Sequence, residues 1–286
     1  MIVLRTDHGP FRLVDVYYPV TYPLNGIGYS PRLNEIVYLR QAPAPLNAVN
    51  FVAHSRTSET TLIDLTRDVD LVFREMSATT RRQIRKIERL GAQMVVRRND
   101  RVALQDFRTI YNSFVGWKKH TEQLSEARLN VLSTVADIFV AYFDGRPLCG
   151  HTYIRDLELK RVGLLMAAST RFDNGDAPIF VGSVNRWLHW YEMRLYKSEG
   201  MAVYDFGGIG RGSIEKEGVA RFKLSFGGRP VTEYNYIVAG RIGRAAISLF
   251  YALRRLRRLN RRINGQFDAK GPTVRLNDMA HFSVDD

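Results

Sequence analysis

Apolar residues recur three and four positions apart along much of the chain, which is the spacing of a helix with one buried face. In "TTRRQIRKIERLG", Thr79 or Thr80 is expected to cap the helix and Gly91 to end it in a left-handed conformation. The same spacing predicts helices in the segments 67–76, 79–90, 103–114, 125–135, 180–200, a short helix that includes 221–226, and 240–267.

Short apolar runs between turn residues predict strands. Residues 1–65 are rich in Pro, Gly and Tyr and are expected to form strands set between turns. The turn signal Asp144-Gly145-Arg146-Pro147 predicts the first connection of an antiparallel meander over 137–169. Strands are expected in the segments 34–41, 48–54, 92–98, 137–143, 148–155, 161–169, 201–206 and 231–239.

Charge and cysteine content narrow the class of partner and the compartment. The 286 residues carry a formal net charge of +13, so anionic partners are expected: nucleotides, CoA phosphates, tRNA or acidic lipid head groups. Solubility alone is the alternative explanation of the arginine content. Cys149 stands alone, which excludes an intramolecular disulfide and a cysteine metal cluster and suits a reducing compartment. No apolar stretch approaches the length of a membrane span, so the expected location is the cytoplasm, free or peripheral at the inner face of the membrane.

The order of predicted elements over residues 92–238 is β-α-α-β-β-β-α-β-α-β, which resembles the Gcn5-related N-acetyltransferase (GNAT) fold. Within it, the strand ending "YDFGGI" (204–209) and the helix ending "RFKLSFGG" (221–228) resemble the C-terminal domain of the FemAB-like acyltransferases. The helix "TTRRQIRKIERLG" is similar to the helix that precedes that domain. The N-terminal 65 residues match loosely, as a reduced version of the family's first domain.

The resemblance implies a mixed α/β (α+β) fold with a largely antiparallel central sheet flanked by helices. The expected organisation is a reduced N-terminal GNAT-like half, an acyltransferase domain, a basic amphipathic helix and a loose tail, over residues 1–91, 92–239, 240–267 and 268–286. The implied activity is transfer of an acyl group to an amine, without a metal.

Acyl transfer to an amine requires a hydrogen-bond donor or positive group near the oxyanion of the tetrahedral intermediate. In the FemAB-like family the Phe-Lys pair matched by Phe222 and Lys223 lies at the acyl-transfer site, and the resemblance implies that Lys223 stabilises the transition state. An exposed helix lysine is the alternative. Glycines without a Cβ let a substrate approach the backbone, or simply form turns. The glycines concerned are Gly207, Gly208, Gly227 and Gly228.

Two further residues are candidates for proton transfer. Asp205 ends its strand, where it would either accept the proton of the attacking amine or cap the following loop. His151 shares a strand face with Cys149 and Tyr153, so all three point either into a cleft or into the core. Its imidazole suits a general base, although a buried structural histidine is the other interpretation. A nucleophilic Cys149 is disfavoured, because attack on a thioester needs no covalent enzyme intermediate.

The acyl donor is expected to be acyl-CoA, with aminoacyl-tRNA as the alternative. In GNAT enzymes a Gln/Arg-x-x-Gly-x-Gly/Ala loop at a helix N-terminus binds the CoA pyrophosphate. The corresponding stretch "RFDNGDA" offers Arg171, Gly175 and Ala177 but has one residue too many and two aspartates. This departure favours tRNA. The absence of the long helical arm of some tRNA-dependent relatives favours CoA.

The acceptor pocket is expected around "GWKKH" (116–120), in a loop between two helices. Lys118 and Lys119 would hold the diphosphate of a nucleotide-linked amino sugar or a related cell-surface polymer precursor, and Trp117 would stack on a ring. A solvated loop is the alternative. Tyr22 and Tyr29 are weaker candidates for the same pocket.

Two basic helices remain. The segment 81–89 presents Arg81, Arg82, Arg85, Lys86 and Arg89, either to solvent or to a phosphate or tRNA. The segment 240–264 combines an apolar stripe with many arginines, which is typical of helices that bind an anionic membrane surface. Packing on its own domain, with the arginines facing tRNA or solvent, is the other hypothesis. A non-catalytic membrane or nucleic-acid binder on a GNAT-like fold is the alternative from outside enzymology.

Overall fold

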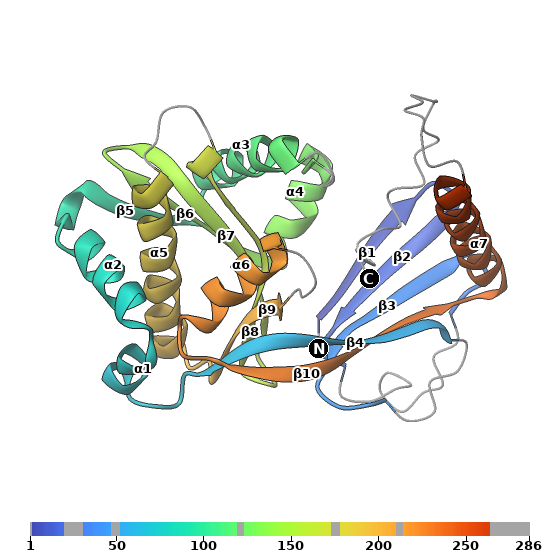
Figure 1. Cartoon of the computed structure of the whole chain (residues 1–286), viewed down its shortest axis with the longest axis horizontal. Coiled ribbons are helices and arrows are strands. Elements are labelled where there is room, and N and C mark those ends of the chain that lie inside the picture. The colour runs from blue at the N-terminus through green and yellow to red at the C-terminus, as the bar shows by residue number, and fades with distance from the viewer. Residues whose placement is uncertain are drawn as a thin grey trace. The chain divides into compact units, whose positions relative to one another are not determined.

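The computed structural model describes residues 2–19, 31–46, 52–118, 123–172, 178–209 and 214–263 (Figure 1). Its chain divides into two compact units. The first comprises residues 1–58 and 232–286, and the second residues 59–231. Within the described ranges, every helix is too short or too polar to serve as a membrane span.

The second unit contains a six-stranded arrangement in the order β4-β9-β8-β7-β6-β5. All neighbours are antiparallel except β8 and β9, which run parallel over three residue pairs. The predicted meander is confirmed, and Asp144 and Gly145 form its two-residue turn with φ of 47° and 77°. The strands are β4 (Val52–Asp64, of which 59–64 lie in this unit), β5 (Met94–Arg98), β6 (Ala136–Phe143), β7 (Arg146–Asp156), β8 (Arg161–Ser169) and β9 (Val203–Ile209).

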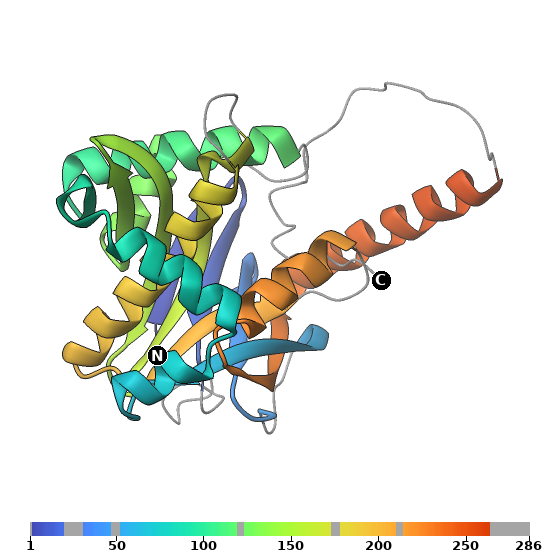
Figure 2. The same cartoon turned by 60° about the vertical axis from the view of Figure 1, so that its left-hand side comes forward.

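Helices cover both faces of these strands, as the alternation of β6 requires (Figures 1 and 2). Phe139 and Ala141 face one core, which α1, α2, α5 and α6 complete, whereas Ile138 and Val140 face a second core under α3 and α4. The helices are α1 (Val69–Glu75), α2 (Ala78–Glu88), α3 (Arg101–Lys118), α4 (Glu126–Ser133), α5 (Pro178–Ser198) and α6 (Ile214–Leu224), with 3₁₀ turns η2 (Gly91–Gln93) and η3 (Thr170–Phe172).

The start of α2 differs from the prediction. Ser77, and not Thr79 or Thr80, is the N-cap, because its hydroxyl accepts the Thr80 backbone N–H at 3.2 Å. The Thr80 side chain is buried and donates to the Ser225 hydroxyl at 2.9 Å. The prediction for Gly91 is confirmed, since its φ is +56°.

The division into units also differs from the expected boundary at residue 91. Ile84 and Ile87 of α2 are fully buried in the same core as Leu188 of α5. Helical spacing marks the apolar face of α2 but not the element that covers that face. Residues 59–91 therefore belong to the same unit as β5–β9.

The first unit places its strands in the order β1-β2-β3-β10-β4. The hairpin β1–β2 was not among the individually predicted strands, and the expected strand at 48–54 begins at Val52 within the described residues. The C-terminal helix packs on one face of this unit through Ile247, which joins a core with Ile36 and Ile237. The elements are β1 (Ile2–His8), β2 (Phe11–Tyr17), β3 (Glu35–Ala42), β10 (Arg229–Ala239) and α7 (Arg241–Ile263).

Mostly antiparallel strands flanked by helices are thus found in both units. The predicted mixed α/β fold class is confirmed.

Candidate active site

The end of β9 is irregular where the glycine pair begins. Gly207 adopts φ of +70°, which an L side chain rarely tolerates. The β4–β9 ladder shifts register at the same point, between the pairs Thr60–Gly208 and Leu62–Asp205. A bulge of this kind bends a strand and redirects its backbone groups. Here it leaves the residues after Asp205 outside the parallel ladder with β8, which ends at the pair Gly163–Asp205.

Asp205 holds this bulge in place from inside the protein. Its carboxylate is fully buried and accepts hydrogen bonds from the guanidinium of Arg161 at 2.6 Å, the hydroxyl of Thr60, and the backbone N–H of Gly207 at 2.8 Å. These hydrogen bonds tie the carboxylate to groups of the protein itself, one of them in its own loop. Of the two expected roles of Asp205, this geometry favours capping of the loop.

Lys223 lies over the bulge from the last turn of α6. Its side chain is half-buried, and its ammonium donates to the carbonyl of exposed Gly208 at 2.7 Å. A Cβ on Gly207 would lie 3.9 Å from Nζ. Burial lowers the pKa of Lys223 to about 8, against an opposing effect of Asp205. Lys223 and the pair Gly207–Gly208 are therefore together, as predicted, and the ammonium lies against the backbone and not out in solvent.

The second glycine pair packs closely against other parts of the chain. Gly227 has φ of +82°, and a Cβ there would lie 2.8 Å from the backbone oxygen of Glu75. A Cβ on Gly228 would lie 2.5 Å from the Thr61 side chain. The close approach that these glycines permit is to the protein's own chain. Gly227 thus has a packing role at the end of α1, and its contact with a substrate stays a prediction.

Replacing Gly227 by alanine is expected to destabilise the protein by about 2 kcal/mol, from the left-handed backbone and the contact with Glu75. Chemical denaturation would measure the change. The matched control is Gly145→Ala, which has φ of +77° but nothing within 4 Å of the added Cβ, and should cost about 1 kcal/mol. Equal losses in the two variants would contradict the packing role.

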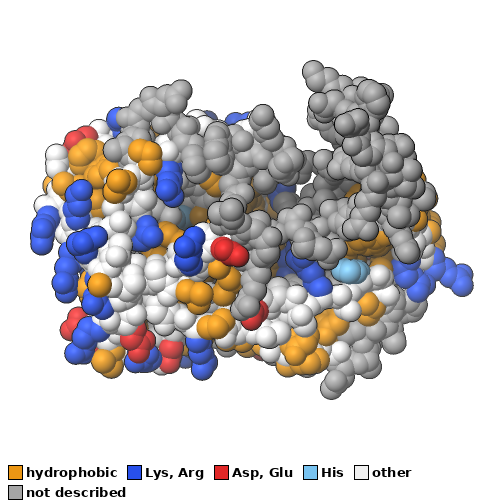
Figure 3. Space-filling model, in the orientation of Figure 1, with side chains coloured by type: hydrophobic (Ala, Val, Ile, Leu, Met, Phe, Trp, Pro, Cys, Tyr) orange, Lys and Arg blue, Asp and Glu red, His pale blue; other side chains and the backbone are white. Residues whose placement is uncertain are grey.

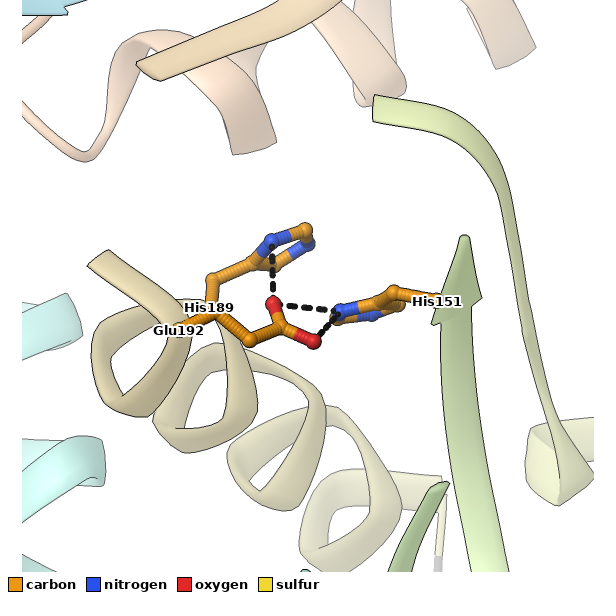
Figure 4. A group of neighbouring side chains, drawn as sticks. All are labelled: His151, His189 and Glu192. Carbon is orange, nitrogen blue, oxygen red and sulfur yellow. Dashed lines mark hydrogen bonds and ion pairs between the residues drawn. The ribbon is translucent and has the colours of Figure 1, made fainter. Parts of the chain in front are cut away.

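A cluster of buried polar side chains joins β7 and α5 (Figure 4). His151 Nδ1 lies 2.8 Å from a Glu192 oxygen, and His151 Nε2 lies 2.7 Å from Asn185 Oδ1. His189 projects from one turn before Glu192, and its ring stacks on that of His151 with centroids 4.0 Å apart. His151 thus points into the core, with Cys149 and Tyr153 on the same face.

Two tyrosine hydroxyls complete the cluster. Tyr153 donates to Glu192, and the Tyr204 hydroxyl is hydrogen-bonded to His189 Nδ1 at 2.7 Å. Burial is the main cause of every pKa shift here: it raises the pKa of Glu192, lowers that of His189 well below its usual range, and raises those of both tyrosines. Burial also raises the pKa of the Cys149 thiol, which is the opposite of what a nucleophilic cysteine needs.

Among the described residues, His151, His189 and Glu192 could hold a metal ion by distance, because their ligand atoms all lie within 4.8 Å of one another. Metal ligation requires the in-plane lone pairs of both imidazoles to converge on one point. Here the rings stack with only 21° between their planes, and Nδ1 of each ring is hydrogen-bonded within the cluster. The arrangement fits a hydrogen-bonded network and does not fit a metal centre.

Aromatic rings connect this cluster to the lysine. The centroids of the His189 and Phe222 rings are 5.6 Å apart. The guanidinium of Arg186 lies 4.7 Å from the centroid of the same Phe222 ring. Lys223 and Arg186 both contribute to the lowered pKa of His189. Phe222, predicted as part of the acyl-transfer pair, therefore connects the helix turn that carries Lys223 to the buried histidines.

Sequence reasoning missed His189 and Glu192, together with Thr60 and Arg161. The available signal for the first two was a His-x-x-Glu spacing inside the most apolar part of the 180–200 helix, where two polar residues one turn apart imply a shared partner. Thr60 and Arg161 carry no local signal, because each is 44 or more positions from Asp205.

The remaining predicted residues are not brought into this site by the described structure. Arg171 is exposed in η3. Gly116, Trp117 and Lys118 continue α3, so this part of the expected acceptor loop is helical, and the side chains of Trp117 and Lys118 lie outside the described set. Four predicted residues lie outside the described residues, and their roles stay predictions: Tyr29, Lys119, Gly175 and Ala177, as does the weaker candidate Tyr22.

No protein-family model and no curated protein matches the chain. Solved structures do. FemX aligns with a TM-score of 0.57 and 12% identity over 86% of this chain and 85% of its own. The C-terminal domain of a putative lysylphosphatidylglycerol synthetase from Agrobacterium fabrum aligns at 0.50 and 14% identity, over 87% and 83%. L-PGS from Bacillus licheniformis aligns at 0.50 and 14%, over 88% and 85%. The chain has the fold of FemX, and the fold expected from the FemAB-like resemblance is confirmed.

Proposed function

We propose that this protein is an acyltransferase that moves an acyl group from acyl-CoA to the amine of a nucleotide-linked amino sugar or a related cell-surface polymer precursor. The observation that carries the proposal is the ammonium of Lys223 held 2.7 Å from the carbonyl of Gly208, beside the bulged end of β9. The likeness of the fold to FemX supports an acyltransferase, and in this chain the short parallel pair β8–β9 lies next to the bulge.

The chemistry follows from the position of this charge. A neutral amine attacks the thioester carbonyl, the carbonyl oxygen becomes an oxyanion, and collapse of the intermediate expels the CoA thiolate, which takes up the proton lost by the amine. Lys223 stabilises the oxyanion by direct hydrogen bonding. Its pKa of about 8 keeps most of the side chain cationic at pH 7. A positioned donor of this kind is worth about 3 kcal/mol, or about a hundredfold in rate.

A second candidate function is transfer from aminoacyl-tRNA to a peptidoglycan precursor. The observation that favours it is the exposed face of α2, where Lys and Arg side chains gather (Figure 3). Arg82, Arg85, Lys86 and Arg89 are exposed there, and the one acidic residue of the helix, Glu88, pairs with Arg194 at 3.6 Å. Arg81 is not part of this face, since it donates to the carbonyl of Met76 at 2.7 Å. Such a surface attracts a phosphate backbone.

The Agrobacterium fabrum structure gives this second candidate further support, because its name describes synthesis of a lipid that carries a lysine. The two donors differ in the part of the protein they would need. The phosphates of CoA would bind at the loop before α5. The phosphate backbone of tRNA would instead bind the exposed cations of α2.

One assay separates the two donors. The purified protein is incubated with acetyl-CoA and an amino-sugar nucleotide, and in parallel with aminoacyl-tRNA and a peptidoglycan precursor, each with and without RNase. We expect release of the CoA thiol with acetyl-CoA, unaffected by RNase and by the variant Lys86→Glu/Arg89→Glu. Turnover only with aminoacyl-tRNA, lost with RNase and weakened by that variant, would establish the second candidate. Absence of turnover with either donor, over a panel of amine acceptors, would reject both in favour of a binding protein.

A further inference from the structure

The helix α7 has two apolar faces, and the described residues of the first unit cover one of them. On the covered face, Ile247 is 4% exposed and packs with Ile36 and Ile237. A Cβ on Gly243 would lie 3.1 Å from the Glu35 carbonyl, so the helix backbone lies directly on β3. Further along, the Tyr251 ring lies 5.5 Å from that of His54. These contacts fix the rotation of the helix about its axis.

The other apolar face carries large residues that the described chain leaves in solvent. Ile242 is 53% exposed, Leu249 61% and Leu253 42%. Spacings of seven and four residues place these three side chains on one line along the helix. Three large aliphatic residues on one line are a continuous stripe, unlike the single exposed apolar residues that are normal on protein surfaces.

The charge of the helix identifies what would cover this stripe. Residues 241–263 contain eight arginines and no acidic residue. Six of the arginines fall in 254–262, at helix positions that are off the line of Ile242, Leu249 and Leu253. Leu256, seven residues after Leu249, continues that line. An apolar line on a helix whose other positions carry many arginines matches the boundary between acyl chains and anionic head groups.

We propose that α7 lies in the plane of an anionic lipid bilayer, with Ile242, Leu249 and Leu253 inserted among the acyl chains and its arginines on the head groups. Each arginine near an anionic membrane surface contributes about 1 kcal/mol to the free energy of binding. A second copy of the chain is a poor occupant of the stripe, because it would bring another helix with eight positive charges. A nucleic acid would use the arginines but has nothing to cover the leucines.

Vesicle flotation with the full chain tests this proposal. The vesicles contain phosphatidylcholine alone or with 30% phosphatidylglycerol, and the variant is Leu249→Glu/Leu253→Glu. The matched control is Leu71→Glu/Val131→Glu, which adds the same charge at two residues of α1 and α4 that are each 41% exposed. We expect the wild type and the control to bind the anionic vesicles. The lipid concentration for half-maximal binding should rise at least tenfold for the α7 variant, and at least tenfold for the wild type on phosphatidylcholine alone.

Three outcomes would overturn the proposal. The first is failure of the wild type to bind anionic vesicles, and the second is equal binding by the α7 variant. The third is a wild-type dimer in light scattering without lipid that becomes a monomer in the α7 variant, which would assign the stripe to a second copy. Unchanged thermal unfolding of both variants shows that the fold is retained, as expected for exposed positions.

Discussion

Lys223→Ala is expected to lower turnover about hundredfold, because it removes the ammonium that stabilises the oxyanion. The purified variant should retain the wild-type circular dichroism spectrum, since the side chain is half-buried and its hydrogen-bond partner belongs to the exposed residue Gly208. The matched control is Arg221→Ala, which removes an exposed cation from the same helix and should leave turnover unchanged. Turnover of Lys223→Ala within threefold of the wild type would exclude the catalytic role.

The pH dependence of the wild type gives a second readout of the same residue. The pKa of Lys223 is about 8, so its cation is lost as the pH rises through that value, and the rate should fall on this alkaline side. In Lys223→Arg the guanidinium stays charged throughout this range, so this fall should disappear even if the different shape of the side chain lowers the overall rate. Retention of the same alkaline limb in Lys223→Arg would assign it to another group.

Asp205→Ala is expected to cost about 3–5 kcal/mol of unfolding free energy, because it leaves the guanidinium of Arg161 buried without its carboxylate. The Asp205 side chain is fully buried and that of Arg161 is 7% exposed. Urea denaturation would measure the loss. The control Asp7→Ala breaks the exposed pair with Arg12 and should cost less than about 1 kcal/mol.

The combination Arg161→Met/Asp205→Leu separates loss of packing from loss of charge pairing. Replacing both members of a buried pair by apolar residues is often close to neutral, so the double variant should be more stable than Asp205→Ala. A double variant as unstable as the single one would show that the pair itself is not the source of the effect.

The elements of the fold were accessible from sequence where the signal is local. Apolar periodicity identified α5, and the Asp144–Gly145 pair identified the β6–β7 turn, since both depend on neighbouring residues. The cap of α2 was placed two or three residues late because three hydroxyl residues follow one another closely there, and only the accepted N–H distinguishes Ser77. The Gly9-Pro10 turn joins the strands β1 and β2. The prediction for residues 1–65 named strands between turns in general and did not identify this hairpin.

The site was accessible only in part, for a different physical reason. Lys223 and Gly207 were found through two short motifs that lie near each other in the sequence. The hydrogen bond from Thr60 to Asp205 joins positions 145 apart, so no local pattern encodes it. Gly227 and Gly207 look alike in sequence, yet one packs on Glu75 and the other lies below the lysine. The atoms that surround each glycine distinguish the two positions, and these come from parts of the chain distant in sequence.

The hydrogen bond between Lys223 and Gly208 orders the lysine side chain before a substrate binds. An ammonium has three protons, so one can fix its direction on a backbone carbonyl while others remain to meet an incoming negative charge. The entropy of immobilising this long side chain is then lost when the chain folds and not at each turnover. Substrates would meet a charge that is already aimed, which shortens the reorganisation that separates binding from reaction.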